Sequence, residues 1–113
     1  PWNDPTKDIT RKLTVQPELF LLAEQEGRII GSVMAGYEGH RGWINYLAVH
    51  PDHRRAGLGR QLMAAAEKRL LSLGCPKINL QVRTSNAAAI GFYQSIGFAQ
   101  DEVVSYGKRL IPD

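Results

Sequence analysis

Val49-His50-Pro51-Asp52-His53-Arg54-Arg55-Ala56-Gly57-Leu58-Gly59-Arg60 is the stretch that decides the fold. It follows an apolar run, Trp43 to Val49, which is typical of a central β-strand, and it leads into a helical pattern. Two glycines stand at the start of that pattern with three arginines around them. Because the N–H groups at a helix N-terminus carry partial positive charge, this turn predicts a cradle for phosphate groups.

Two other glycine-rich phosphate cradles do not fit this turn. A P-loop requires Lys and then Ser or Thr after its last glycine, whereas Gly59 is followed by Arg60 and Gln61. A Rossmann fingerprint requires a third glycine at position 62, which is Leu62. A nucleotide triphosphatase and a hydride-transferring dehydrogenase are therefore both disfavoured.

The helix that follows the turn is amphipathic. Its apolar stripe consists of Leu58, Leu62, Ala66, Leu70 and Leu73, with Arg60, Gln61, Glu67 and Lys68 on the other side. Gly74 and Pro76 are typical of a helix end, so the pattern predicts a helix over 57–73. An alternating stretch over 77–83 predicts a strand, and this β-α-β unit requires its two strands to be parallel with a right-handed crossover.

The rest of the chain extends this unit in both directions. Upstream, Asp4 as N-cap and Pro5 predict a short helix over about 5–15, and a β-hairpin follows over 19–24 and 28–37. Downstream, Ser85 or Asn86 caps a second helix that Gly97 ends, and a last strand is expected over about 102–110. Residues 1–113 are thus expected to form a single domain of the α+β (mixed α/β) class, with antiparallel strands before the β-α-β unit and helices on both faces of one mixed sheet.

Composition excludes several broad classes of protein. The 113 residues are 43% hydrophobic with a net charge of +3, which does not suit a disordered chain. No stretch approaches the roughly 18 to 20 apolar residues needed to cross a bilayer. A single cysteine, Cys75, allows no internal disulfide and is interpreted as structural, so a cytoplasmic protein is expected. Nine of the 14 basic residues follow residue 50, and an anion is therefore expected to bind in the second half.

Three motifs in order resemble those of the GCN5-related N-acetyltransferase (GNAT) superfamily. Arg54 to Gly59 fits its signature of Arg or Gln, two residues of any type, Gly, any residue, then Gly or Ala. Leu47 to Pro51 is similar to its fourth strand, and Asn86 to Phe98 is similar to its Asn…Tyr…Gly-Phe helix. The stretch 82–98 is particularly similar to the ribosomal-protein alanine N-acetyltransferase branch.

The resemblance implies an enzyme that moves an acetyl group from acetyl-coenzyme A directly to a primary amine, in a ternary complex and without a metal. The amine is that of a protein N-terminus, a lysine or a small molecule. The cofactor-binding positions that it implies are Leu47, Ala48 and Val49 along the pantetheine arm, Arg54, Arg55, Ala56, Gly57, Leu58, Gly59 and Arg60 at the pyrophosphate, and Asn86 and Ala89 in the helix that follows. Tyr93 is implied as the catalytic acid, and a phenol is able to protonate the departing thiolate.

The chain departs from the family pattern in two respects. Many relatives carry a glutamate on the fifth strand where this chain has Gln81, so the general base is open between Glu38, His40 and Tyr46, each acting through a water. The family's first strand and helix have no counterpart before Pro1. Truncation, or a strand supplied by a partner such as a second copy in a homodimer, is expected to account for this.

Two other functions remain open from the sequence. A coenzyme A-binding regulatory module with impaired catalysis is compatible with Gln81 and with the short N-terminus. A small basic RNA-binding domain is less favoured, because the aromatic residues are scattered and form no stacking platform. His50 and His53 lack partners at metal-ligand spacing, so no metal is expected, and neither is a membrane partner.

Overall fold

A computed structural model describes residues 5–54 and 56–112. Three helices and four strands follow one another in the order α1 (Pro5–Lys12), β1 (Phe20–Gln25), β2 (Arg28–Tyr37), β3 (Gly42–Val49), α2 (Leu58–Ser72), β4 (Ile78–Leu80) and α3 (Ala87–Ser95). Short 3-10 turns, Pro17–Leu19 and Pro51–His53, precede β1 and α2. No helix within these residues is both long and apolar enough to span a membrane.

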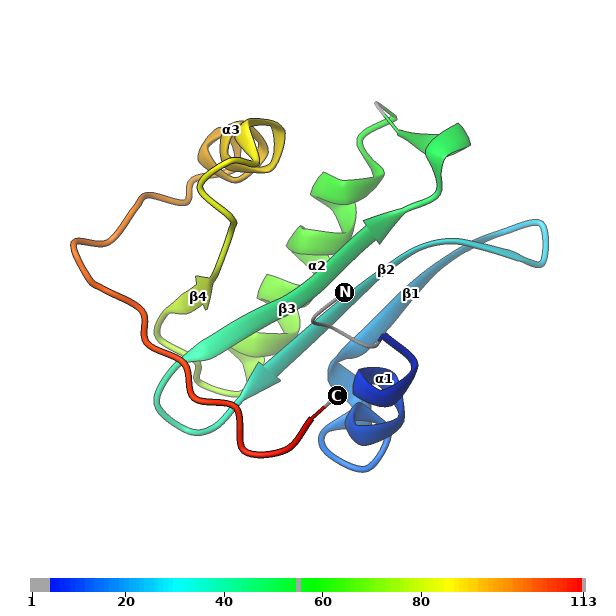
Figure 1. Ribbon diagram of the computed structural model, residues 1–113. Helices are drawn as coiled ribbons and strands as arrows, with labels where there is room; N and C mark the ends of the chain where they lie inside the picture. Colours follow the sequence, from blue (N-terminus) through cyan, green and yellow to red (C-terminus); the bar gives the residue numbers. More distant parts are fainter. Residues whose placement is uncertain (1–4, 55, 113) are drawn as a thin grey trace.

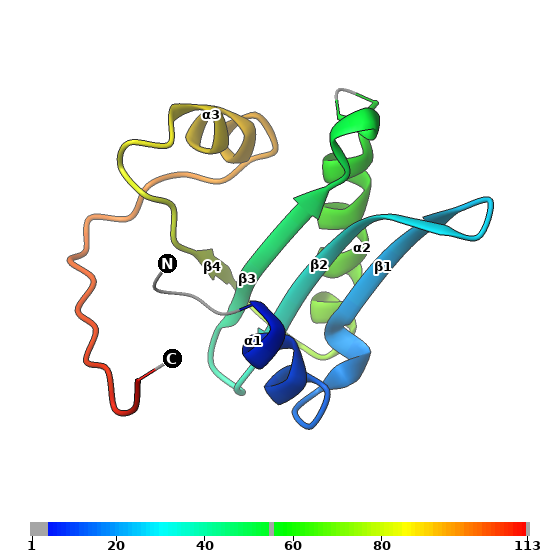
Figure 2. The same ribbon diagram turned by 45° about the vertical axis from the view of Figure 1, so that its right-hand side comes forward.

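The strands form one mixed sheet in the order β1-β2-β3-β4. Strands β1, β2 and β3 pair with one another in antiparallel fashion. Strands β3 and β4 are parallel, because α2 carries the chain back to the edge of the sheet at which β3 begins. Helices α1 and α2 cover opposite faces of this sheet, and α3 stands beyond the end of β4 (Figures 1 and 2). The predicted mixed α/β fold with helices on both faces is confirmed.

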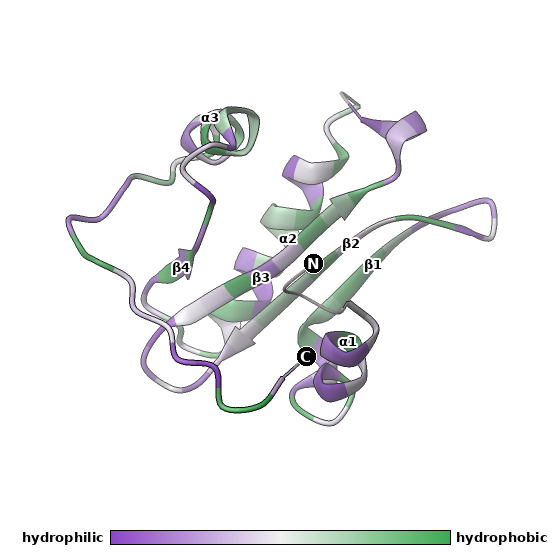
Figure 3. Ribbon diagram, in the orientation of Figure 1, coloured by the Kyte–Doolittle hydropathy of each residue, from purple (hydrophilic) through white to green (hydrophobic). Residues whose placement is uncertain are grey.

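The core lies between α2 and the sheet. Leu62, Met63, Ala66 and Leu70 of α2 are buried against a face that includes Val33, Ala35 and Ile44. In Figure 3 apolar residues run along β1 and β2, whereas the tip of the β1–β2 hairpin and α1 are hydrophilic. Core contacts therefore fix α2, whereas polar contacts help to attach α1: the Gln16 side chain just after it donates to Tyr37 O at 2.7 Å and accepts from Tyr37 N at 3.0 Å.

Two glycines let α2 and the segment after it lie close to the sheet. A Cβ atom added to Gly42 would lie 2.7 Å from the Sγ of Cys75 and 3.3 Å from Leu70 Cδ1. A Cβ added to Gly31 would lie 2.9 Å from Leu62 Cδ1. Cys75 is buried at this contact, in agreement with its structural interpretation.

The predicted boundaries hold best where a local pattern sets them. The helix expected over 57–73 is α2 (Leu58–Ser72), whereas the strand expected over 77–83 is reduced to β4 (Ile78–Leu80). The N-cap predicted at Asp4 lies outside the described residues.

The strand predicted over 102–110 is wrong. Residues 101–112 form an exposed segment without regular secondary structure, in which Val103 and Val104 are each 77% exposed. Two side-chain contacts attach its beginning to the β4 region, an ion pair between Lys77 and Asp101 at 2.8 Å and a hydrogen bond from Gln81 to Ser105. Alternating apolar residues favour a strand only where a neighbouring strand accepts their hydrogen bonds, and β4 is three residues long.

The close contact at Gly42 gives a test of the packing. We expect Gly42→Ala to destabilise the protein by about 1–3 kcal/mol, because the new methyl group overlaps Cys75 and Leu70. The matched control is Gly91→Ala in α3, which places its methyl group in open space and removes a helical glycine. That change should leave the stability unaltered or raise it by up to about 1 kcal/mol. Urea unfolding measures both, and equal effects would contradict the proposed contact.

Candidate functional site

The sheet opens between β3 and β4. The two strands pair at only three positions, Gly42 with Ile78, Trp43 with Asn79 and Ile44 with Leu80. At the same level β3 has an irregularity, because Ala35 pairs with Ile44 while Met34 pairs with Tyr46. Beyond this point β3 continues to Val49, whereas the chain after Leu80 leaves the sheet towards α3 (Figure 1). Leu47, Ala48 and Val49, the predicted pantetheine-pairing positions, all lie in this separated part of β3.

The N-terminus of α2 follows the separated part of β3 after a connection over 50–57, and it has no side-chain cap. Its N-cap residue, Gly57, has φ 78°, which a residue with a Cβ adopts only at a cost. The first N–H groups of a helix lack acceptors within that helix, so those of Leu58, Gly59 and Arg60 have no acceptor in α2. No atom of a described residue lies within 4 Å of the position that a Cβ on Gly57 would take. The turn is therefore open and suited to an anion such as a phosphate group.

The described arginines of this turn differ in their contacts. The Arg54 side chain is exposed, as is Ala56, and Arg60 donates to Ser95 Oγ of α3 at 3.4 Å. Arg55 lies outside the described residues. Arg54 is thus placed to add positive charge to the turn, and Arg60 also links the start of α2 to the end of α3.

Gly59 has a packing role in addition to the one predicted. A Cβ at this position would lie 3.4 Å from Phe92 Cζ and 3.8 Å from Val49 Cγ2. The missing side chain thus lets the first turn of α2 approach the Phe92 ring. No local sequence pattern indicates this contact, because it depends on how α3 docks against α2.

Helix α3 begins at Asn86 and carries Tyr93 near its end. The Oδ1 atom of Asn86 accepts a hydrogen bond from Ala89 N at 3.1 Å, which confirms the predicted N-cap. The Tyr93 ring is half-buried between Phe92 and Phe98, with ring centroids 5.1 and 5.7 Å away. Burial raises the pKa of the Tyr93 phenol, so the hydroxyl, which an ordinary tyrosine also keeps protonated near neutral pH, has a proton to donate.

The candidates for the general base lie in different parts of the structure. The carboxylate of Glu38 accepts from the backbone N–H groups of His40 and Arg41, so it caps the β2–β3 loop. His40 in that loop is exposed, and Gln81 is exposed and bonded to Ser105. Tyr46 is half-buried on β3 and donates a hydrogen bond to Asp8 of α1.

Sequence reasoning did not identify two residues of α1 that face the sheet. Asp8 reaches Tyr46, and Lys12 is 8% exposed with its ammonium group beside Gly36. Burial lowers the pKa of Lys12, and the negative charge of Glu18 acts in the opposite direction. The two side chains are four positions apart and so lie on one face of the helix, a spacing visible in the sequence. The sheet residues that they meet could not be read from it.

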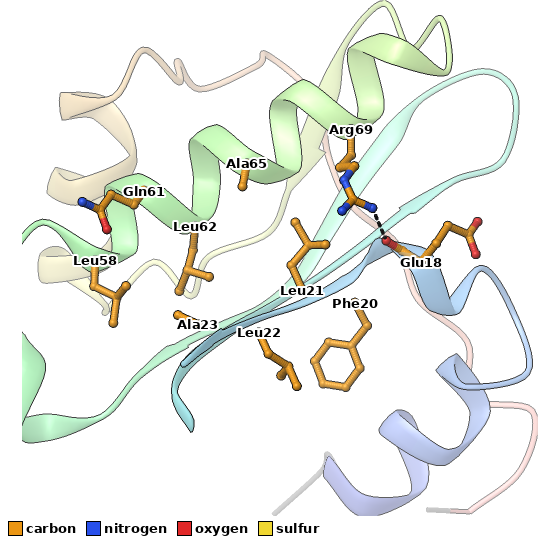
Figure 4. Close-up of a pocket in the computed structure, with 10 residues that line it drawn as sticks. All are labelled: Glu18, Phe20, Leu21, Leu22, Ala23, Leu58, Gln61, Leu62, Ala65 and Arg69. Carbon is orange, nitrogen blue, oxygen red and sulfur yellow. Dashed lines mark hydrogen bonds between the residues drawn. The ribbon is translucent and has the colours of Figure 1, made fainter. Parts of the chain in front are cut away.

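A groove of about 670 Å³ lies elsewhere, between β1 and α2 (Figure 4). Its lining is mostly apolar and includes Leu21, Leu58 and Leu62, and at one end Arg69 donates to the backbone oxygen of Glu18 at 3.2 Å. Leu58 is the one predicted site residue in this lining. Among the described residues, no three His, Cys, Asp or Glu side chains gather into a possible metal site.

Comparison with known proteins gives a consistent result for sequence and fold. The family described as "Acetyltransferase (GNAT) family" matches residues 1–98. A protein of Yersinia pestis (strain Pestoides F) named "Acetyltransferase" is 52% identical over 113 residues, which is 100% of this chain and 80% of that protein.

Two solved structures illustrate the likeness in fold. Ard1 from Thermoplasma volcanium has a TM-score of 0.73 and 29% identity, over 83% of this chain and 62% of that chain. The aminoglycoside N-acetyltransferase AAC(6')-Iy in complex with CoA has a TM-score of 0.69 and 22% identity, over 80% of this chain and 65% of that chain.

Proposed function

Because the chain belongs to the GNAT family of acetyltransferases and is an acetyl-coenzyme A-dependent acyltransferase, we propose that its acceptor is a primary amine. The amine belongs to a protein N-terminus, a lysine or a small molecule, and it receives the acetyl group directly in a ternary complex. The observation that carries this proposal is the uncapped N-terminus of α2 beside the opening between β3 and β4. An anion-binding turn next to an unpaired stretch of strand suits a long, phosphate-bearing donor.

The donor is proposed to lie along the predicted residues. Backbone groups of Leu47, Ala48 and Val49 hold the pantetheine arm in place of the strand that departs after Leu80. The turn of Arg54, Arg55, Ala56, Gly57, Leu58, Gly59 and Arg60 binds the pyrophosphate. Asn86 donates from its amide NH₂ to the arm while its Oδ1 caps α3, and Ala89 lines the same side of the helix. Acetyl-coenzyme A supplies the acetyl group as an activated thioester.

Tyr93 is proposed as the catalytic acid. Its phenol, whose pKa is raised further by burial, carries its proton near neutral pH, and its aromatic contacts with Phe92 and Phe98 hold the ring. A donor held in this way is able to protonate a thiolate as the carbon–sulfur bond breaks.

The names of two similar proteins support a nitrogen atom as the acceptor of the acetyl group. A further Yersinia pestis protein, 52% identical over 113 residues, is named an N-acetyltransferase, and AAC(6')-Iy acts on aminoglycosides by name. Most aliphatic amines are protonated at neutral pH, so the site must also remove a proton from the acceptor. The alternative, a coenzyme A-binding regulatory module, is favoured by Gln81 at the position where many relatives carry a glutamate.

The function is tested by binding and turnover together. Coenzyme A at 100 times its dissociation constant should stabilise the fold by about 2.7 kcal/mol in a thermal melt. Acetyl-coenzyme A turnover is then screened over protein N-terminal peptides, lysine peptides, polyamines and aminoglycosides. We expect release of free thiol with at least one amine class. Stabilisation by coenzyme A without turnover of any amine would favour the regulatory module, and stabilisation by RNA alone would contradict both functions.

Gly57 provides a matched test of the phosphate cradle. Gly57 and Gly27 have nearly the same backbone, with φ 78° and 77°, and an added Cβ meets no described atom within 4 Å at either position. Replacing either glycine by Ala should therefore cost about 1–2 kcal/mol of stability. Only Gly57→Ala should weaken coenzyme A binding, by about 1.5–3 kcal/mol in calorimetry, because the turn no longer presents its N–H groups correctly. Equal affinities of the two variants for coenzyme A would place the pyrophosphate elsewhere.

Tyr93→Phe tests the proposed acid. The ring and its packing remain, so the melting temperature and the affinity for coenzyme A should barely change. Without the phenolic proton, kcat and kcat/KM should fall together by about 10²–10⁴-fold, because the lost interaction forms as charge develops on sulfur. Steady-state kinetics with an acceptor found in the screen measures this. If the variant kept the parent's kcat, Tyr93 would not be the catalytic acid and would have only a packing role.

A further inference from the structure

We propose that Tyr46 and Asp8 remove the proton from the acceptor amine, with Tyr46 in contact with the amine and Asp8 positioning Tyr46 and receiving its proton. This inference rests on the proposed function. It assigns a carboxylate to the reaction in a chain that has Gln81 where many relatives carry a glutamate, and it uses a residue of α1 for which the sequence predicted no role.

The contact between the two side chains joins α1 to the sheet. Tyr46 donates its hydroxyl proton to Asp8 Oδ2, and Arg11 donates to the other oxygen, Oδ1, at 3.3 Å. The carboxylate is therefore held from two sides, which fixes the oxygen that faces Tyr46. The strand partner of Tyr46 is Met34, which is 4% exposed, so a buried apolar residue lies beside Tyr46 in the sheet.

The position of Tyr46 along β3 brings the Tyr46–Asp8 pair next to the residues proposed to bind the donor. Tyr46 is two residues beyond the last β3–β4 pair at Ile44 and one residue before Leu47, where the proposed pantetheine contacts begin. It also lies at the irregularity of β3, since its pairing with Met34 follows directly on the pairing of Ile44 with Ala35. The face of the sheet that it shares with α1 is opposite to the face that α2 covers (Figure 2). An acceptor that approaches from the side of α1 would thus meet Tyr46 at the level where the sheet opens.

Glu38 and Gln81 are engaged in other contacts. Both carboxylate oxygens of Glu38 accept backbone N–H groups of its own loop, at 3.1 and 2.5 Å. Gln81 has no basic oxygen of comparable strength, and its amide donates to Ser105. Lys12 on α1, whose pKa is lowered by burial, does not offer a carboxylate. Asp8 keeps a side-chain exposure of 25%, which gives an accepted proton a way to water.

In the proposed reaction Tyr46 and Asp8 take a proton from the acceptor, and Tyr93 gives one to the departing sulfur. The ammonium form of the acceptor first loses a proton to the Tyr46 oxygen, while the phenolic proton of Tyr46 moves to Asp8 Oδ2. The neutral amine nitrogen then bonds to the acetyl carbon and loses its second proton to water. The carbon–sulfur bond breaks, its electron pair stays on sulfur, and sulfur takes the proton of Tyr93. Asp8 then releases its proton to water and Tyr93 regains one from water. The net products are the acetylated amine and the free thiol.

Asp8→Asn separates this role from a purely structural one. The asparagine oxygen still accepts from Tyr46, so α1 remains attached, but an amide does not take up the proton. The probes are ethylamine, which is protonated at pH 7, and 2,2,2-trifluoroethylamine, which is largely neutral there. We expect kcat/KM for ethylamine to fall by about 100-fold or more, and the rate with trifluoroethylamine to stay close to that of the parent. Tyr46→Phe should give the same selective loss.

Two matched controls and two measurements without acceptor complete the experiment. Asp101→Asn makes the same chemical change at an ion pair with Lys77, and Tyr37→Phe makes it at a hydroxyl that donates to Gly39 O. Both lie away from the sheet opening, so neither should change the ratio of the rates with the two amines. Melting temperature and acetyl-coenzyme A affinity of Asp8→Asn should match the parent. In ligand-free protein, NMR should show a slowly exchanging hydroxyl proton that Tyr46→Phe removes and Asp8→Asn shifts.

The outcomes are distinct. A selective loss with ethylamine in both variants supports the pair. Equal losses with both amines, no loss, or a loss that parallels a lower melting temperature in both variants would reduce the pair to a structural contact and overturn the inference, while the acetyltransfer function stands. A parent protein that binds acetyl-coenzyme A but acetylates no amine would overturn the proposed function and this inference together.

Discussion

The arrangement of the candidate site depends on the early end of the pairing between β3 and β4. Three residue pairs hold the two strands together, and after Ile44 and Leu80 they separate. A short parallel contact still fixes the register of the β-α-β unit and therefore the position of α2. The separation leaves the second half of β3 with unpaired backbone groups towards α3, next to the uncapped N-terminus of α2. The same three pairs thus provide both the continuity of the sheet and the opening beside which the proposed donor and acceptor residues lie.

The opening also has a chemical consequence for the two faces of the sheet. On the side of α2, the first helical turn and Arg54 offer N–H groups and positive charge. On the side of α1, Tyr46 and Asp8 offer a hydroxyl and a carboxylate. In the proposed reaction the phosphate-bearing donor and the amine acceptor would therefore meet different chemical groups on the two faces of the sheet.

Much of the fold could be predicted because its signals are local. The stripe of Leu58, Leu62, Ala66 and Leu70 set α2 to within one residue at its start and end, and Asn86 marked the start of α3 through its own side chain. The strand expected over 102–110 failed for the opposite reason, since strand formation depends on a partner that the local pattern does not reveal. In the site, Gly57 was identifiable from its turn. The contact of Asp8 with Tyr46 was not, because 38 positions separate them and only the docking of α1 brings them together.

Gly59 shows how packing limits the residues that relatives can carry at one position. An added Cβ would lie 3.4 Å from Phe92 Cζ, which is an ordinary van der Waals distance, so alanine fits where glycine stands. Any larger side chain would displace the ring that lies next to Tyr93 in the sequence. In this chain the packing of α3 therefore leaves room for Gly or Ala at position 59. During divergence, positions 59 and 92 are expected to change in a coordinated way, with a bulkier residue at one accompanied by a smaller residue at the other.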